Sequence, residues 1–148
     1  MAKSKKFWVL ALIIWMAVIF LFTQLPYFTG ENTSKAIFKL FAVEHDITQS
    51  SDAGSVLITA VNIILRKASH LTGFGIIAFL LFQVFRNFRF PYLLSWVLTF
   101  LYAITDEWHQ SFVPGRTASF QDVLIDGLGA FIALLLTYLF SSRKRKIR

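Results

Sequence analysis

The chain carries no charged residue between Lys6 and Glu31, and this gap constrains its fold more than any other feature. The segment 7–25, FWVLALIIWMAVIFLFTQL, is close to the roughly 20 apolar residues that an α-helix needs to cross a bilayer. Composition agrees, because 56% of the 148 residues are hydrophobic and 16% are charged, against about 45–50% and 25% in soluble domains. A soluble domain of this size would leave too much apolar surface in water. The sequence therefore predicts an integral membrane protein.

Three further uncharged runs follow, and each is bounded by charged residues. We expect an all-α membrane protein with one domain over residues 1–148 and four transmembrane helices, at about 7–25, 68–85, 90–105 and 123–142. The first run could instead be the core of a signal peptide, because lysines precede it. No A-x-A-like cleavage site follows it, so we interpret it as an uncleaved anchor.

The basic residues are distributed unevenly along this arrangement. Four spans place both termini on one side, which then holds ten basic residues and no acidic one, whereas the other side holds all eight acids and five bases. The positive-inside rule predicts that both termini are cytoplasmic. The basic run at the C-terminus could contact nucleic acid or anionic lipid. Beside a spanning helix it is more often a topology anchor, so we expect no nucleic-acid partner.

The first outer loop, roughly Pro26–Arg66, is not plainly polar. Its segment Ser55–Leu65, SVLITAVNIIL, is apolar but too short to span a bilayer alone. We expect the loop to be partly helical, with this segment either extending the second spanning helix outward or lying on the membrane surface. Its β-branched residues leave a small pair of strands open as an alternative.

Two polar clusters flank the outer ends of the predicted helices. In the first, Lys67 and His70 are three residues apart and share a helical face. In the second, Asp106 and Glu107 lie four and three residues before Gln110, so one face carries carboxylates and an amide. A lone histidine at a helix end is a packing residue as often as it is a functional one.

The second cluster continues into a turn and a new helix. Pro114-Gly115 suits the central positions of a type II turn, which would direct Arg116 back towards the preceding helix end. Ser119 then has the character of an N-cap, with Asp122 at the third helical position. Asp126 follows one turn deeper, and the small residues after it let another helix approach closely.

Carboxylates near a membrane interface are costly unless they are paired, so these residues are candidates for function. Because three helices carry them at a common depth, we expect one polar pocket. Its predicted members are Lys67, His70, Asp106, Glu107, Gln110, Arg116, Asp122 and Asp126. A structural alternative is a simple ion pair of Arg116 with Glu107 or Asp126, and Asp122 is also explained by the dipole at a helix start.

The two clusters together resemble the VanZ-like family, named after a teicoplanin-resistance protein. Its first pattern is Lys, His and an aromatic residue, and Lys67, His70 and Phe74 match it, with Phe in place of the more usual Tyr. The second pattern leads from Asp-Glu to a Gly-rich helix. Its matching residues here are Asp106, Glu107, Gln110, Phe112, Pro114, Arg116, Asp122 and Gly129. The resemblance implies a multi-pass protein of the bacterial plasma membrane, linked in some members to lowered sensitivity to glycopeptide antibiotics, and no established reaction.

Two functions fit these residues. In the first, Arg66, Lys67 and Arg116 bind the anionic head group of a lipid or lipid-linked cell-wall precursor at the outer leaflet, since guanidinium groups bind phosphate well. In the second, the protein is an enzyme acting on such a lipid, with His70 or Glu107 as general base and Arg116 as the clamp. No nucleophile motif or phosphate-binding glycine loop supports the enzyme.

Two further ideas are weaker. A metal site could be built from His70, His109, Asp106 and Glu107, but no tight motif such as H-E-x-x-H is present, so we expect no cofactor. A transporter is a further alternative, and because four spans leave little room for a pathway it would need to form an oligomer.

Overall fold

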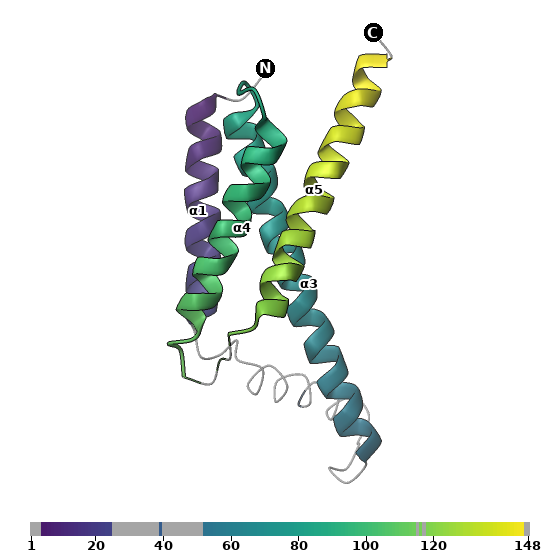
Figure 1. Cartoon of the computed structure of the whole chain (residues 1–148). Coiled ribbons are helices and arrows are strands. Elements are labelled where there is room, and N and C mark those ends of the chain that lie inside the picture. Colours follow the sequence, from purple (N-terminus) through teal and green to yellow (C-terminus); the bar gives the residue numbers. More distant parts are fainter. Residues whose placement is uncertain (1–3, 25–38, 40–51, 115, 117, 147–148) are drawn as a thin grey trace.

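The computed structural model describes residues 4–24, 39, 52–114, 116 and 118–146. These residues form four long helices, and no strand lies among them: α1 (Lys5–Gln24), α3 (Asp52–Phe85), α4 (Pro91–Gln110) and α5 (Phe120–Lys146). The helices run alternately up and down, so the start of α1 and the end of α5 lie at the same end of the bundle (Figure 1). The all-α prediction is confirmed.

Three of these helices are long and apolar enough to cross a membrane, within Lys5–Thr23, Thr59–Phe85 and Phe120–Ser142. The expectation of four such helices is therefore corrected to three. The exception is α4, which is as long as α1 but carries polar residues along its length, among them Ser95, Thr99 and Asp106, all buried in the bundle. These side chains are buried against the other helices, where packing between helices accommodates polar groups.

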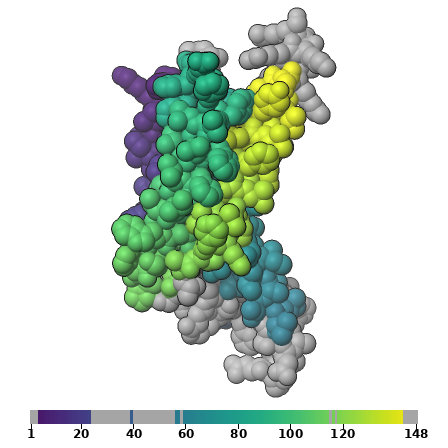
Figure 2. All heavy atoms as spheres, viewed as in Figure 1, coloured from purple at the N-terminus to yellow at the C-terminus, as the bar shows by residue number. Residues whose placement is uncertain are grey.

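The second spanning segment is much longer than residues 68–85. A single helix, α3, runs from Asp52 to Phe85, and its first part projects beyond the packed bundle (Figures 1 and 2). The segment Ser55–Leu65 thus extends the spanning helix, as one of the predicted alternatives had it, and forms neither a strand nor a separate surface helix. Most of the loop before it lies outside the described residues.

Small residues let α3 and α5 pack backbone against backbone, as predicted. A Cβ atom placed on Gly129 would collide with the backbone of Leu71, whose carbonyl carbon would lie 2.8 Å away. One at Gly75 would lie 3.2 Å from the carbonyl oxygen of Gly129. Ala130 is fully buried in the same contact. This close approach brings the polar residues of α3 and α5 within reach of each other.

Aromatic side chains fix the register of the other helices. The indole of Trp15 on α1 donates to the carbonyl of Gly73 (3.0 Å), and that of Trp96 on α4 donates to the carbonyl of Gly127 (3.0 Å). The Tyr102 hydroxyl donates to the carbonyl of Met16 (3.3 Å). Buried Trp and Tyr need such acceptors. These bonds hold α1 against α3 and α4, and α4 against α5, near the site described next.

Candidate functional site

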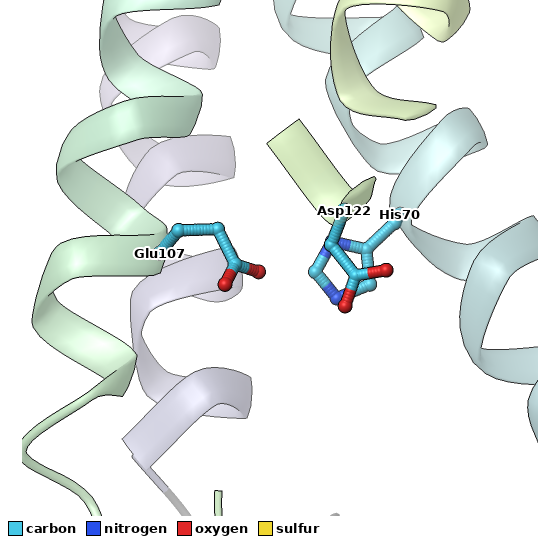
Figure 3. Close-up of side chains that lie close together, drawn as sticks. All are labelled: His70, Glu107 and Asp122. Carbon is cyan, nitrogen blue, oxygen red and sulfur yellow. The ribbon is translucent and has the colours of Figure 1, made fainter. Parts of the chain in front are cut away.

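Polar side chains gather inside the bundle at the end where α4 stops and α5 begins. Five of them are at most 5% exposed, and they come from only two helices: Asp106, Glu107, Gln110, Asp122 and Asp126. His70 of α3 joins them, and Figure 3 shows Glu107 reaching from α4 towards His70 and Asp122. Side chains of α3, α4 and α5 that were expected to share a pocket therefore lie close together, with the exception of Lys67 and with the differences in pairing described below.

His70 is held by Asp126, which lies on α5 one helical turn beyond Asp122. Its Nδ1 lies 3.1 Å from one Asp126 carboxylate oxygen and 3.4 Å from the other. The ring also stacks on Phe74, at 6.3 Å between centroids and 4° between planes. Nδ1 is thus the ring nitrogen that contacts a carboxylate, and Nε2 is the nitrogen left for another partner. The hydrogen-bond partner of His70 is thus Asp126.

Glu107 caps the following helix from outside it. Its Oε2 accepts the backbone N–H of Ser119, the residue before α5, at 2.7 Å. In a capping box the acid at the third helical position, here Asp122, would accept this N–H. Because Glu107 takes it, the Asp122 carboxylate faces His70 and Glu107 (Figure 3). Ser119 and Asp122 stand at the positions predicted for the helix start.

A chain of hydrogen bonds links α4 to α1 through Arg116. Gln110 donates to Asp106 at 2.7 Å, as their spacing predicted, and accepts from Nη1 of Arg116 at 3.0 Å. Nη2 of Arg116 donates to the carbonyl of Phe22 at 3.1 Å. Burial lowers the pKa of the Arg116 guanidinium, and the charge of Asp106 acts in the opposite direction. These two acceptors differ from Glu107 and Asp126, the partners in the alternative ion pair.

The turn before Arg116 is partly described. The backbone N–H of Arg116 donates to the carbonyl of Val113 at 3.1 Å, which is the hydrogen bond of a β-turn centred on Pro114 and Gly115. Its type depends on Gly115, which lies outside the described residues.

Two basic residues of α3 behave differently from each other. Arg66 lies 3.6 Å from Asp122 and is 44% exposed, so it is an accessible cation at the rim of the cluster. Lys67 is half-buried and lines no part of the groove described below, whereas Arg66 and His70 both do. Of the residues predicted for the pocket, Lys67 has the weakest structural link to it.

Three side chains are placed so that they could hold a metal ion. A ring nitrogen of His70 and one carboxylate oxygen each of Glu107 and Asp122 lie within 4.8 Å of one another. The set considered from the sequence, as a weaker idea, was a different one: His70, His109, Asp106 and Glu107. His109 instead packs against Phe20, with 5.0 Å between ring centroids and 44° between ring planes, and Asp106 accepts a hydrogen bond from Gln110.

A groove of about 580 Å³ opens beside the cluster, between α1 and α3. Apolar side chains form most of its wall, and polar groups line its other part. The apolar residues are Trp15, Val18, Ile19, Phe22, Leu65, Phe74 and Ile76, and the charged or titratable ones are Arg66, His70, Asp106 and Arg116. Volumes of about 300–1,000 Å³ are usual for small-molecule sites.

The contribution of α1 to this groove was not predicted. Its sequence is apolar on every side, so no pattern marked Trp15 or Ile19 as groove residues or the Phe22 carbonyl as an acceptor. The one available signal was Thr23, a polar residue near the end of the apolar run, which is buried and lines the groove.

The helices, their hydropathy and the buried polar cluster define the class of protein: an all-helical membrane protein with a polar site at one end of its bundle. The chain belongs to the VanZ/LLP1 family, whose family model matches residues 8–141. This match confirms the resemblance seen in the sequence. No curated protein and no solved structure is similar enough to match the chain.

Proposed function

We propose that this protein binds a membrane lipid or lipid-linked cell-wall precursor in the groove between α1 and α3. The observation that carries this proposal is the groove itself, which combines an apolar wall with a cationic polar part. A hydrocarbon chain suits the wall formed by Trp15, Ile19 and Ile76. The head group would then lie beside Arg66 and Arg116.

The charges near the groove favour a phosphate. Arg66 is 44% exposed and remains accessible beside Asp122. A guanidinium offers a planar fork of N–H donors that matches the oxygens of phosphate. Arg116 contributes its positive charge to the same polar part, although its Nη atoms also bond to Gln110 and Phe22.

We further propose that the polar site faces the outside of a bacterial plasma membrane. The start of α1 and the end of α5 share one end of the bundle, and the polar cluster lies towards the other (Figures 1 and 3). The basic residues flanking α1, α5 and the short link between α3 and α4 favour the cytoplasmic side for the first end. A site at the outer leaflet suits a protein that lowers sensitivity to glycopeptide antibiotics by occupying or shielding a wall precursor.

A second function is favoured by the pair formed by His70 and Asp126. A carboxylate that orients an imidazole through Nδ1 is the arrangement of a general base, with Nε2 directed to a substrate. His70 also lines the groove. An enzyme acting on the bound lipid is therefore the alternative, and it differs from the binder in releasing an altered lipid.

Lipid retention in native mass spectrometry tests the proposal, with a matched pair of variants on α3. Leu65 lines the groove, whereas its neighbour Ile64 is 64% exposed and does not. We expect L65W to fill the groove and to abolish retention of a phospholipid or isoprenoid phosphate that the wild type and I64W retain. Equal retention by both variants would contradict a site in this groove, and a chemically altered lipid would favour the enzyme.

A further inference from the structure

Three different helices bring a nitrogen and two oxygens to one point beside the groove. His70 comes from α3, Glu107 from α4 and Asp122 from α5, and one ligand atom of each lies within 4.8 Å of the other two (Figure 3). Around a tetrahedral ion with bonds of about 2.0–2.2 Å, neighbouring ligand atoms are about 3.4 Å apart. Small side-chain rotations are enough to close the remaining distance.

Each of the three side chains is already oriented by a partner behind it. Asp126 holds Nδ1 of His70, which leaves Nε2 for a ligand. The Ser119 N–H binds one oxygen of Glu107, which leaves the other. Arg66 lies 3.6 Å from Asp122. The first two contacts are hydrogen bonds of the kind that typically fixes metal-binding histidines and carboxylates, and the third is a longer ion pair.

The balance of charge in the cluster also favours a cation. Among the described residues, four carboxylates are buried here: Asp106, Glu107, Asp122 and Asp126. The guanidinium groups beside them are those of Arg66 and Arg116, and Arg66 is 44% exposed. Buried carboxylates without matching positive charge are unfavourable. A divalent cation between His70, Glu107 and Asp122 would supply it.

We propose that His70, Glu107 and Asp122 bind one divalent transition-metal cation of the zinc or manganese type. Imidazole favours zinc among common ions, and carboxylate also suits manganese, so this mixed set is unlike the all-oxygen sites of calcium and magnesium. From the sequence, Glu107 and Asp122 were expected to belong to a polar site that holds no metal. The weaker metal-site idea did not include Asp122. Three protein ligands leave a coordination position open, as in sites that bind a substrate.

The open position has a definite use, and this step rests on the lipid-binding function proposed above. His70 lines the groove, so a cation on its Nε2 would lie at the groove's polar part. The buried carboxylates of Glu107 and Asp122 beside His70 would repel a head-group phosphate that Arg66 and Arg116 attract. The cation would offset this local negative charge and could coordinate a phosphate oxygen directly.

Zinc binding to the purified chain in detergent tests the site without any lipid. After treatment with a chelator and its removal, titration calorimetry with ZnCl₂ should show one zinc per chain. E107Q is the sharpest variant, because its amide oxygen can still accept the Ser119 N–H while the ligand charge is lost. We expect E107Q and H70Q to weaken zinc binding by at least about tenfold, and D126N, which alters only the support of His70, by about 10–100-fold.

His109 serves as a matched control, because its ring packs against Phe20 and H109Q should keep wild-type affinity. Thermal unfolding of every variant without zinc shows which ones remain folded. The proposal is overturned if the wild type does not bind zinc, or if folded E107Q binds it as tightly as the wild type does.

Lipid retention measured with and without chelator separates the two proposals. Zinc binding by a protein that retains no lipid would leave the metal site standing and contradict the lipid function. Lipid retention by a protein that does not bind zinc would contradict the metal site and leave the lipid function standing. If chelator lowers lipid retention at least about tenfold in the wild type but not in E107Q, the result would support coordination of the head-group phosphate by the metal ion.

Discussion

Each Nη atom of Arg116 donates a hydrogen bond within the protein, one to the Gln110 side chain and one to the Phe22 carbonyl. From the sequence, Arg116 was the principal candidate for holding an anionic ligand. In the structure it also joins the end of α1 to the end of α4. Its substitution therefore tests two roles, which different measurements can separate.

We predict that R116A lowers the free energy of unfolding by about 1–2 kcal/mol, because two acceptors lose their donor. R116K keeps the charge and can reach only one of them, so it should recover part of the loss. Chemical unfolding in detergent measures this, with R86A in the exposed link between α3 and α4 as the control. Unchanged stability of R116A together with lost lipid retention would assign Arg116 to the ligand alone.

At the scale of helices, the contact between α3 and α5 sets the geometry of the site. The polar partners His70 and Asp126 lie beside the point where Gly129 meets the backbone of Leu71. No side chain larger than hydrogen fits there. A different glycine of α3, Gly73, faces only the far end of Ile19, at 3.5 Å.

Gly129→Ala should therefore destabilise the protein by about 1–3 kcal/mol, since the new methyl group would force α3 and α5 apart. Gly73→Ala should be neutral or stabilise by up to about 1 kcal/mol, because alanine favours the helix and the contact is ordinary. Thermal unfolding of the two variants in the same detergent gives the comparison. Equal shifts in the melting temperature would contradict the close packing of α3 on α5.

The cap that Glu107 provides should control the first turn of α5. E107A removes the acceptor of the Ser119 N–H, so we expect a local cost of about 0.5–2 kcal/mol and faster amide hydrogen exchange there. E107Q keeps an oxygen and should retain most of the protection. Gln121→Ala, an exposed change in the same turn, is the control. Equal exchange in E107A and Q121A would mean that Glu107 does not cap α5.

The sequence allowed α4, the start of α5 and most of the polar cluster to be predicted. Polar residues at helical spacing indicate which face of a helix is polar, and an N-cap residue indicates where a helix begins. Asp106 with Gln110, and Ser119 with Asp122, are such cases. The groove and the pairing of His70 with Asp126 could not be predicted. They depend on how uniformly apolar helices rotate against each other, and an apolar surface carries no signal for that rotation.

At the scale of the whole molecule, the alternating helices place the short α3–α4 link and the start of α5 at opposite ends of the bundle (Figure 1). The proposed topology can therefore be tested at the α3–α4 link and at the start of α5. The chain has no cysteine, so single introduced cysteines report their own side of the membrane.

We expect Ala118→Cys to react with a membrane-impermeant maleimide in intact cells, because residue 118 is exposed before α5, at the end of the bundle that we propose faces outward. Asn87→Cys, exposed in the link between α3 and α4, should react only after the cells are opened. The two sites control for each other, since both are exposed. The reverse pattern would place the polar site in the cytoplasm.

The hydrogen bonds of α1 bear on the order in which the molecule assembles. They join it to residues 58, 86 and 94 positions away, in the bonds of Trp15 to Gly73, of Tyr102 to Met16, and of Arg116 to Phe22. During synthesis α1 therefore leaves the ribosome long before any of these partners is made. It is apolar enough to be stable in the lipid bilayer before they are present. Because α1 forms one wall of the groove, the groove is completed only when α1 docks onto the helices that are made after it.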